Sequence, residues 1–259
     1  MGFNKFLVCA FVALGLDAAA AAQRIAVTHI QKPLHQFMVA RDEAGKIIAR
    51  GEFTQAVQGD EVSMRLNYQF LDGSVDDETT TYTQRGTFRL VRYHHVQKGP
   101  FFQKPVDYSV EAATGTATRR TVGSDGKAHD ESTHIDLPDD VANGIVGTLL
   151  LNVPPNTAPF RVGLLAPVGS GRLIRLLISA EGEQTFQMDG RPLKATVFRI
   201  HPELGGIVGL IAQLIGLQPK DVMVWVLEGD EPAVVRIVGQ LGGYGPVVSS
   251  ELAGASFGK

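Results

Sequence analysis

The residues that could carry out chemistry are few and poorly placed for catalysis. A serine hydrolase needs a nucleophile beside a base, often on a Gly-x-Ser-x-Gly turn between a strand and a helix, and the sequence contains no such motif. Ser170 lies between two glycines, but this segment precedes a predicted strand and offers no helix N-terminus, which phosphate binding would also require. We therefore interpret Gly169-Ser170-Gly171 as a turn.

The histidines and acidic residues do not predict a metal site. His94 and His95 are adjacent on a predicted strand, so their side chains point to opposite faces and cannot bind one ion. The acidic turn from Asp72 to Glu78 does not fit the calcium-loop pattern. Asp139 and Asp140 could serve as an acid and a base, but at a predicted helix N-terminus such carboxylates are far more often capping residues. The sequence predicts no metal, no cofactor and no enzymatic activity.

The stretch Leu204–Leu217 is the most unusual part of the chain, because Gln213 is its only polar side chain. A helix that is apolar all round is buried in protein or in lipid. This one is shorter than the roughly 20 residues that a transmembrane helix needs. Pro202 before it and Pro219 after it suit the two ends of a short helix. We expect an apolar helix that lies inside or across a β-sheet.

The N-terminus has the three parts of a secretory signal. Lys5 gives a positive start, Phe6–Leu16 is an apolar core, and Ala20 and Ala22 satisfy an Ala-x-Ala cleavage rule. We expect residues 1–22 to be a signal peptide and residues 23–259 to form a single β-domain. The sequence thus predicts a periplasmic or secreted protein that is soluble after cleavage. Its formal net charge of −3 argues against a nucleic-acid partner.

A first prediction concerns this signal. The mature protein from the cell envelope should begin within a residue or two of Gln23, because the small residues before it favour cleavage there. N-terminal sequencing of the purified protein checks this. A mature pool that retains Met1 would contradict the prediction.

Alternation of apolar and polar residues predicts a mainly β fold. In Glu61–Leu71, Val62, Met64 and Leu66 face one way and the polar residues face the other, so Leu66 is expected in the core. Similar strands are expected before and after it, joined by Gly-containing turns such as Asp189-Gly190. Pro138 and a helical apolar stripe predict a helix over 139–151. So many antiparallel strands should curl into a half-open or closed barrel, covered or filled by the helices at 139–151 and 204–217.

The strand Val222–Leu227 is apolar on both faces and contains Trp225, the only tryptophan. A ligand site for a lipid or other apolar small molecule would be formed by Phe198, Leu210, Leu214 and Trp225. A lone tryptophan in such a strand is more often a core anchor than a ligand contact, and the apolar helix could equally be a plug that fills the barrel.

The C-terminal third resembles a secreted bacterial family of β-rich proteins of unknown function. The similar segments are Val224-Trp225-Val226, Pro232–Arg236, Gly239-Gln240-Leu241, Asp136–Gly144 and Glu203–Gly206. The plan of a curved sheet around a helix is also similar to the lipoprotein-carrier fold of the periplasm, which implies acyl chains held against a concave face. We therefore expect an exported protein that binds a hydrophobic or lipid-like ligand. The alternative is a structural or assembly protein of the cell envelope with a filled core. The sequence does not indicate an oligomeric state.

Overall fold

The computed structural model describes residues 24–123, 125–167, 171–204, 219–241 and 245–257. The predicted signal peptide and the predicted apolar helix at 204–217 therefore lie outside the described residues, apart from Leu204. None of the helices in the described ranges has both the length and the apolar character that a membrane crossing requires.

The described chain is mainly β, as predicted. Its strands are β1 Leu34–Arg41, β2 Ile47–Gln58, β3 Glu61–Phe70, β4 Val75–Arg85, β5 Thr87–Lys98, β6 Val106–Glu111, β7 Thr116–Val122, β8 Ala128–His134, β9 Phe160–Ala166, β10 Arg172–Met188, β11 Arg191–Glu203, β12 Val222–Leu227, β13 Ala233–Gln240, β14 Val247–Leu252 and β15 Ala255–Ser256. A single short helix, α1 Val146–Leu150, occurs among the described residues.

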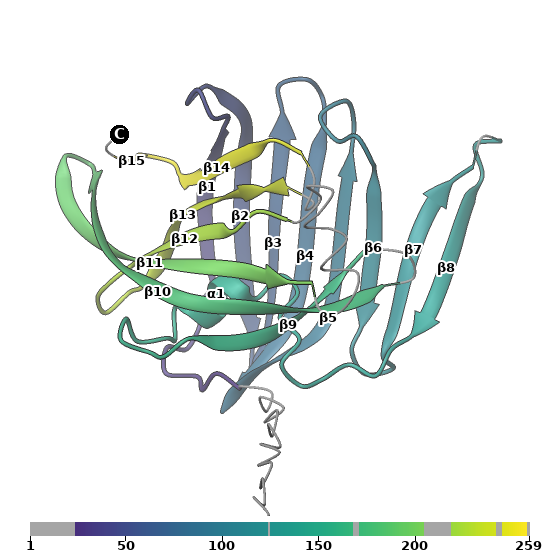
Figure 1. Cartoon of the computed structure of the whole chain (residues 1–259), viewed down its shortest axis with the longest axis horizontal. Coiled ribbons are helices and arrows are strands. Elements are labelled where there is room, and N and C mark those ends of the chain that lie inside the picture. Colours follow the sequence, from purple (N-terminus) through teal and green to yellow (C-terminus); the bar gives the residue numbers. More distant parts are fainter. Residues whose placement is uncertain (1–23, 124, 168–170, 205–218, 242–244, 258–259) are drawn as a thin grey trace, which may run out of the picture.

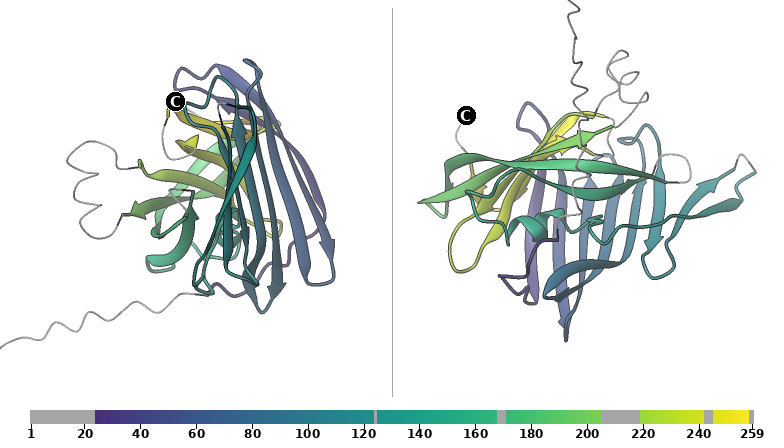
Figure 2. Two further views of the ribbon diagram at one scale, coloured as in Figure 1. Left: turned by 90° about the vertical axis from the view of Figure 1, so that its right-hand side faces the viewer. Right: turned by 60° about the horizontal axis from the view of Figure 1, so that its bottom comes forward.

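All the strands belong to one sheet, which curls over itself. The order is β15-β10-β11-β12-β13-β14-β1-β2-β3-β4-β5-β6-β7-β8, with β9 beside β10, and every named pair is antiparallel. Strands β1–β8 form a broad wall, and β9–β13 cross in front of it (Figures 1 and 2). Within the described ranges β8 and β15 end the order without pairing with each other, so the sheet is an open, barrel-like curl.

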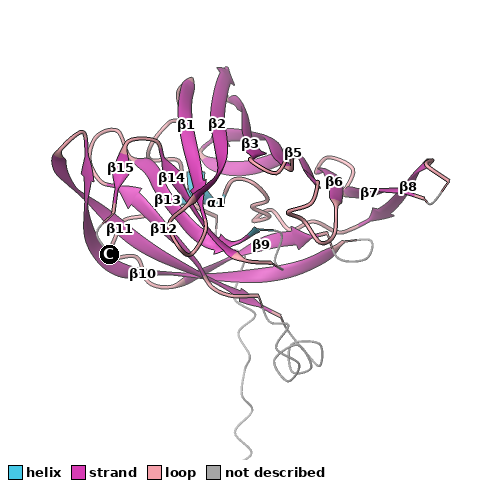
Figure 3. Cartoon of the chain, turned by 90° about the horizontal axis from the view of Figure 1, so that it is seen from above, coloured by secondary structure: helices cyan, strands magenta, loops and turns pink. Residues whose placement is uncertain are grey.

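The space between the wall and the crossing strands is filled around α1, which lies inside the curl when the molecule is seen from above (Figure 3). Ile145, Leu149 and Leu150 of the helix region pack with residues of both layers, including Met64 of β3 and Phe198 of β11. All five side chains are buried. The largest hydrophobic core of the protein is therefore in this half of the curl.

The predicted helix over 139–151 is wrong in its first half. The backbone of Ala142 donates to the carbonyl of Gly163 in β9 over 2.8 Å, and Gly163 donates back to the carbonyl of Asp140 over 3.0 Å. These bonds hold residues 140–142 beside β9 as a short parallel bridge. Gly144 then turns the chain with a φ of +70°. The helix can begin only after that turn, because the earlier backbone groups are already paired.

Candidate functional site

The inner face of the wall can be described as rows of side chains that lie opposite one another across β2–β5. One row contains Gly51, Tyr68, Asp76 and Gln97. The next contains Phe53, Leu66, Glu78 and His95, and the one after it Gln55, Met64, Thr80 and Tyr93. Every member of the first and third rows is buried, whereas every member of the middle row is only half-buried. We call the middle row the central strip.

The central strip is apolar at one end and ionisable at the other. Phe53 and Leu66 supply the apolar end, from β2 and β3, while Glu78 and His95 supply the polar end, from β4 and β5. Leu66 faces the core, as expected, and packs there as a half-buried side chain. A half-buried row between two buried rows is a surface that a bound ligand could cover.

A hydrogen-bonded network fixes the polar end. Nε2 of His95 lies 2.7 Å from Oδ1 of Asp76, and the side-chain amide of Gln97 donates to Oδ2 of Asp76 over 3.0 Å. Burial would lower the pKa of His95, but the hydrogen bond to Asp76 and the charges of Glu78 and Asp76 outweigh it, so this pKa is raised. Both carboxylate oxygens of Asp76 are thus engaged by the protein itself.

Glu78 differs from Asp76 because the described residues give it no hydrogen bond or ion pair. Burial raises the pKa of its carboxyl group, the charge of His95 opposes that rise, and the charge of Asp76 adds to it. Beside it, the Thr80 side chain is 1% exposed and its hydroxyl has no hydrogen-bond partner. Tyr108, which lies opposite His95 on β6, is also 1% exposed and has an unpartnered hydroxyl. Buried polar groups normally have hydrogen-bond partners, so two buried hydroxyl groups without a partner among the described residues are unusual.

The segment from 138 to 144 closes over this polar end. A methyl group on Gly144 would overlap the Thr80 hydroxyl and would lie 2.8 Å from Oε1 of Glu78. Asn143 holds the segment in place: its amide nitrogen donates to the carbonyl of Leu165, and its amide oxygen accepts from the Leu165 nitrogen, both over 2.8 Å. The two oxygens of Thr80 and Glu78 therefore converge on one point beside Gly144.

The ligand residues expected from the sequence are not brought together. Phe198 is 1% exposed and packs in the core around α1. Trp225 lies on the other face of the crossing strands, because it is opposite Val197 while Phe198 is opposite Val224. These two side chains therefore cannot line one cavity. Leu210 and Leu214 lie outside the described residues.

On its own face of the crossing strands, Trp225 makes a hydrogen bond, a cation–π contact and an aromatic contact with other side chains. Its indole nitrogen donates to Oε1 of Gln184 over 2.6 Å. The guanidinium of Arg236 lies 4.9 Å from the indole centroid, and the Phe257 ring contacts the indole edge at a centroid distance of 6.2 Å. With 8% exposure, Trp225 is an anchor for the C-terminal segment on this face.

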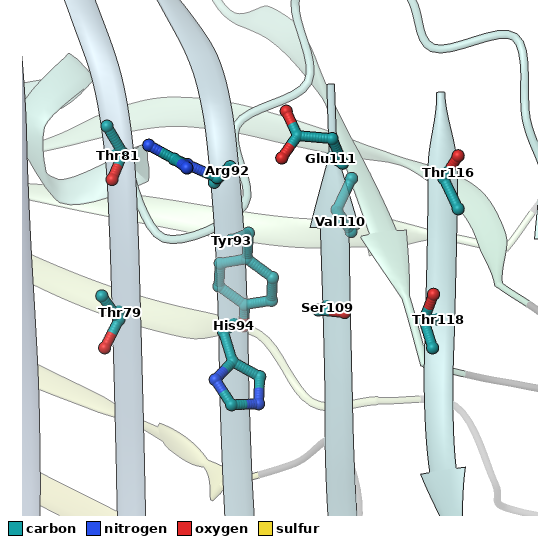
Figure 4. Close-up of a pocket in the computed structure, with 10 residues that line it drawn as sticks. All are labelled: Thr79, Thr81, Arg92, Tyr93, His94, Ser109, Val110, Glu111, Thr116 and Thr118. Carbon is teal, nitrogen blue, oxygen red and sulfur yellow. The ribbon is translucent and has the colours of Figure 1, made fainter. Parts of the chain in front are cut away.

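The outer face of the wall carries two shallow polar hollows, of about 330 and 260 Å³. Figure 4 shows the larger one, in which Arg92 extends toward Thr81 and Glu111 lies between Arg92 and Thr116, with the hydroxyl side chains of Thr79 and Thr118 in the next row. Neighbouring charges on this face are paired across strands, as in Arg120 with Asp130 and His94 with Asp107. We interpret the hollows as the wet face of an antiparallel sheet, where small hydroxyl residues lie between long ones.

His94 and His95 point to opposite faces, since His94 bonds with Asp107 on the outer face and His95 with Asp76 on the inner face. In the part of the chain that the structure describes, no three His, Cys, Asp or Glu side chains come close enough to hold a metal ion. Sequence reasoning missed the central strip. The alternating pattern contained its members, but only the strand register places them in one row.

These features define an open, curled antiparallel β-sheet protein with a partly exposed polar and apolar strip on its concave face. No protein-family model matches the chain, and no curated protein matches it significantly. A solved structure that is similar to it is a β-barrel-like protein of the domain of unknown function DUF1849 from Brucella abortus. The two are 12% identical, the match covers 92% of this chain and 100% of that one, and the TM-score is 0.46.

Proposed function

We propose that this protein is an exported, non-catalytic binding protein that takes up an amphipathic, lipid-like ligand on the concave face of its sheet. The observation that supports this is the central strip, which is half-buried between two fully buried rows. Its apolar end offers Phe53 and Leu66 to an acyl chain, and its ionisable end offers Glu78 and His95 to a polar head. A ligand with both characters would match both ends.

The apolar end can supply useful binding free energy. Each methylene removed from water contributes about 0.8 kcal/mol, so a few methylenes against Phe53 and Leu66 would reach micromolar affinity only together with polar contacts. The sequence was expected to resemble in plan the periplasmic lipoprotein carriers, which hold acyl chains on a concave face, and by analogy with them we propose the concave face as the binding surface.

The test uses a matched pair of variants on one strand. Phe53→Asn removes the largest apolar side chain of the strip, whereas Thr54→Asn changes the adjacent residue, which is exposed on the opposite face. Fluorescence titration with N-phenyl-1-naphthylamine, an uncharged apolar probe, should show saturable binding to the wild type. Phe53→Asn should weaken that binding by about ten- to a hundredfold, since burying such a ring contributes on the order of 1.5–3 kcal/mol. Thr54→Asn should bind as the wild type does.

Thermal melts of both variants establish that they are folded at the titration temperature. If the folded wild type shows no saturable binding of the probe, the proposal is wrong and the structural or assembly role with a filled core becomes the better account. Equal weakening by Phe53→Asn and Thr54→Asn would place the ligand somewhere other than the central strip.

A further inference from the structure

We propose that the polar end of the central strip recognises a positively charged, ammonium-type head group, an inference that rests on the proposed function. The carboxylates of Asp76 and Glu78 lie on neighbouring positions of the inner face, and His95 is the one basic side chain bonded within this cluster. Even with His95 protonated, two carboxylates and one imidazolium leave a net negative charge. A partly desolvated negative charge is best compensated by a cation.

The charge that a ligand would meet is specifically that of Glu78. Asp76 already accepts from Gln97 and bonds with His95, whereas the described residues offer Glu78 no donor. The Glu78 residue is half-buried, and its Oε1 lies 2.8 Å from the position that a Cβ on Gly144 would occupy. The carboxylate therefore has no partner among the described residues, although the Glu78 residue keeps part of its surface exposed.

A second and independent observation comes from Thr80. Its side chain is almost completely buried, its hydroxyl has no partner in the described structure, and it converges with Oε1 of Glu78 on one point. An ammonium group carries several N–H donors, so a head group at Glu78 would bring a donor to this acceptor-rich corner. No described protein side chain supplies one there.

Other head groups fit less well. An anionic head such as a phosphate or sulfate would be placed beside two carboxylates, and because Nε2 of His95 is bonded to Asp76, only its Nδ1 could receive such a group. A bare metal ion needs three or more close ligands, and this cluster does not bring three acidic or histidine side chains within such reach. The chemistry therefore favours an organic ammonium over both.

The experiment compares three amphiphiles that share a twelve-carbon chain: dodecylammonium, dodecyl maltoside and dodecyl sulfate. Titration calorimetry is done at pH 7 and below their micelle concentrations with the full mature protein. Dodecylammonium should bind at least tenfold more tightly than the maltoside, and the sulfate should bind most weakly. Glu78→Gln should remove this preference while leaving maltoside binding unchanged, because it removes the charge and keeps the shape.

A surface carboxylate provides the matched control. Glu52 is exposed on the outer face of β2, so Glu52→Gln changes the net charge equally without touching the strip, and the preference for dodecylammonium should persist. If Glu78→Gln fails to fold, the proposal is tested with the Thr80→Val variant and with the order of affinities that the wild type shows for the three amphiphiles. Thr80→Val should weaken dodecylammonium binding several-fold and leave maltoside binding unchanged.

The outcomes separate the two proposals. Equal affinity for all three amphiphiles, or a preference for the sulfate, would overturn the ammonium inference and leave the lipid-like ligand in place. The same loss of preference in Glu52→Gln as in Glu78→Gln would show that the effect is one of net charge only, and would also overturn it. Failure of all three to bind would contradict the proposed function itself.

Discussion

Arg175→Met should destabilise the protein by about 3–5 kcal/mol. Arg175 of β10 donates through Nη1 to Oδ2 of Asp140 over 2.6 Å, and the Asp140 side chain is only 1% exposed. The other oxygen of that carboxylate, Oδ1, has no partner in the described structure. Removing the guanidinium therefore leaves a buried charge with no cation, which is among the most costly single changes. Denaturant titration followed by tryptophan fluorescence measures the loss.

The control is Arg199→Met, because Arg199 lies on the neighbouring strand and pairs with Glu181 at the surface. Exposed pairs of this kind contribute at most about 1 kcal/mol, so this variant should remain close to the wild type. The double change Arg175→Met with Asp140→Asn should recover part of the stability, since the unpaired charge is gone. If Arg175→Met and Arg199→Met cost the same, the segment from 138 to 144 is not held by a buried ion pair.

The second large effect is expected for Gly144→Ala, at about 2–4 kcal/mol. The residue has a φ of +70°, where an alanine is strained, and its new methyl group would overlap the Thr80 hydroxyl. Gly45→Ala is the matched control: its φ is +80°, but nothing lies within 4 Å of the added carbon. Gly45→Ala should therefore cost only about 1 kcal/mol, the backbone part of the effect.

Thermal and denaturant melts of the two glycine variants measure the difference between their free energies of unfolding directly. Thr80→Ala should restore part of the stability of Gly144→Ala, because it removes the group with which the methyl overlaps. Equal costs at Gly144 and Gly45 would mean that the segment does not press against β4 as the structure has it. In that case residues 138–144 would not cover Glu78 and Thr80, contrary to the structure.

The strands that were predicted well are those with one wet and one buried face. In β3 the alternation from Val62 to Phe70 is directly visible because the two faces meet different environments. β8 gives no such signal, because all but one of its seven residues are exposed and all but Ala128 are polar, so that neither face is marked. A polar edge strand of this kind is fixed by backbone pairing with β7 rather than by burial.

The segment from 138 to 145 was misjudged because local signals and tertiary contacts disagree. Pro138, the two aspartates and the apolar residues that follow are typical of a helix N-terminus. In the structure Asp140 instead pairs with Arg175, and Asn143 bonds with the backbone of Leu165. These partners are on strands that are remote in sequence, and no local pattern reveals them.

The expected grouping of Phe198 with Trp225 failed for a related reason. Phe198 and Trp225 lie on adjacent strands and are both apolar, which suggested a shared cavity, but the register places them on opposite faces. Conversely, Phe53, Leu66, Glu78 and His95 come from four strands and form one row only through that pairing. Strand composition predicted which residues face inward; the register, which depends on turns and bulges, decided which of them meet.

Native mass spectrometry of the purified mature protein tests the central proposal most directly, because it detects a bound amphiphile without assuming its identity. We expect the wild type to carry a stoichiometric adduct of lipid mass that is released on activation in the gas phase. The folded Phe53→Asn variant should carry clearly less of it, and Thr54→Asn as much as the wild type. A wild type that shows only the bare protein mass, also after incubation with the three dodecyl amphiphiles, would contradict the proposal that the central strip binds a lipid-like ligand.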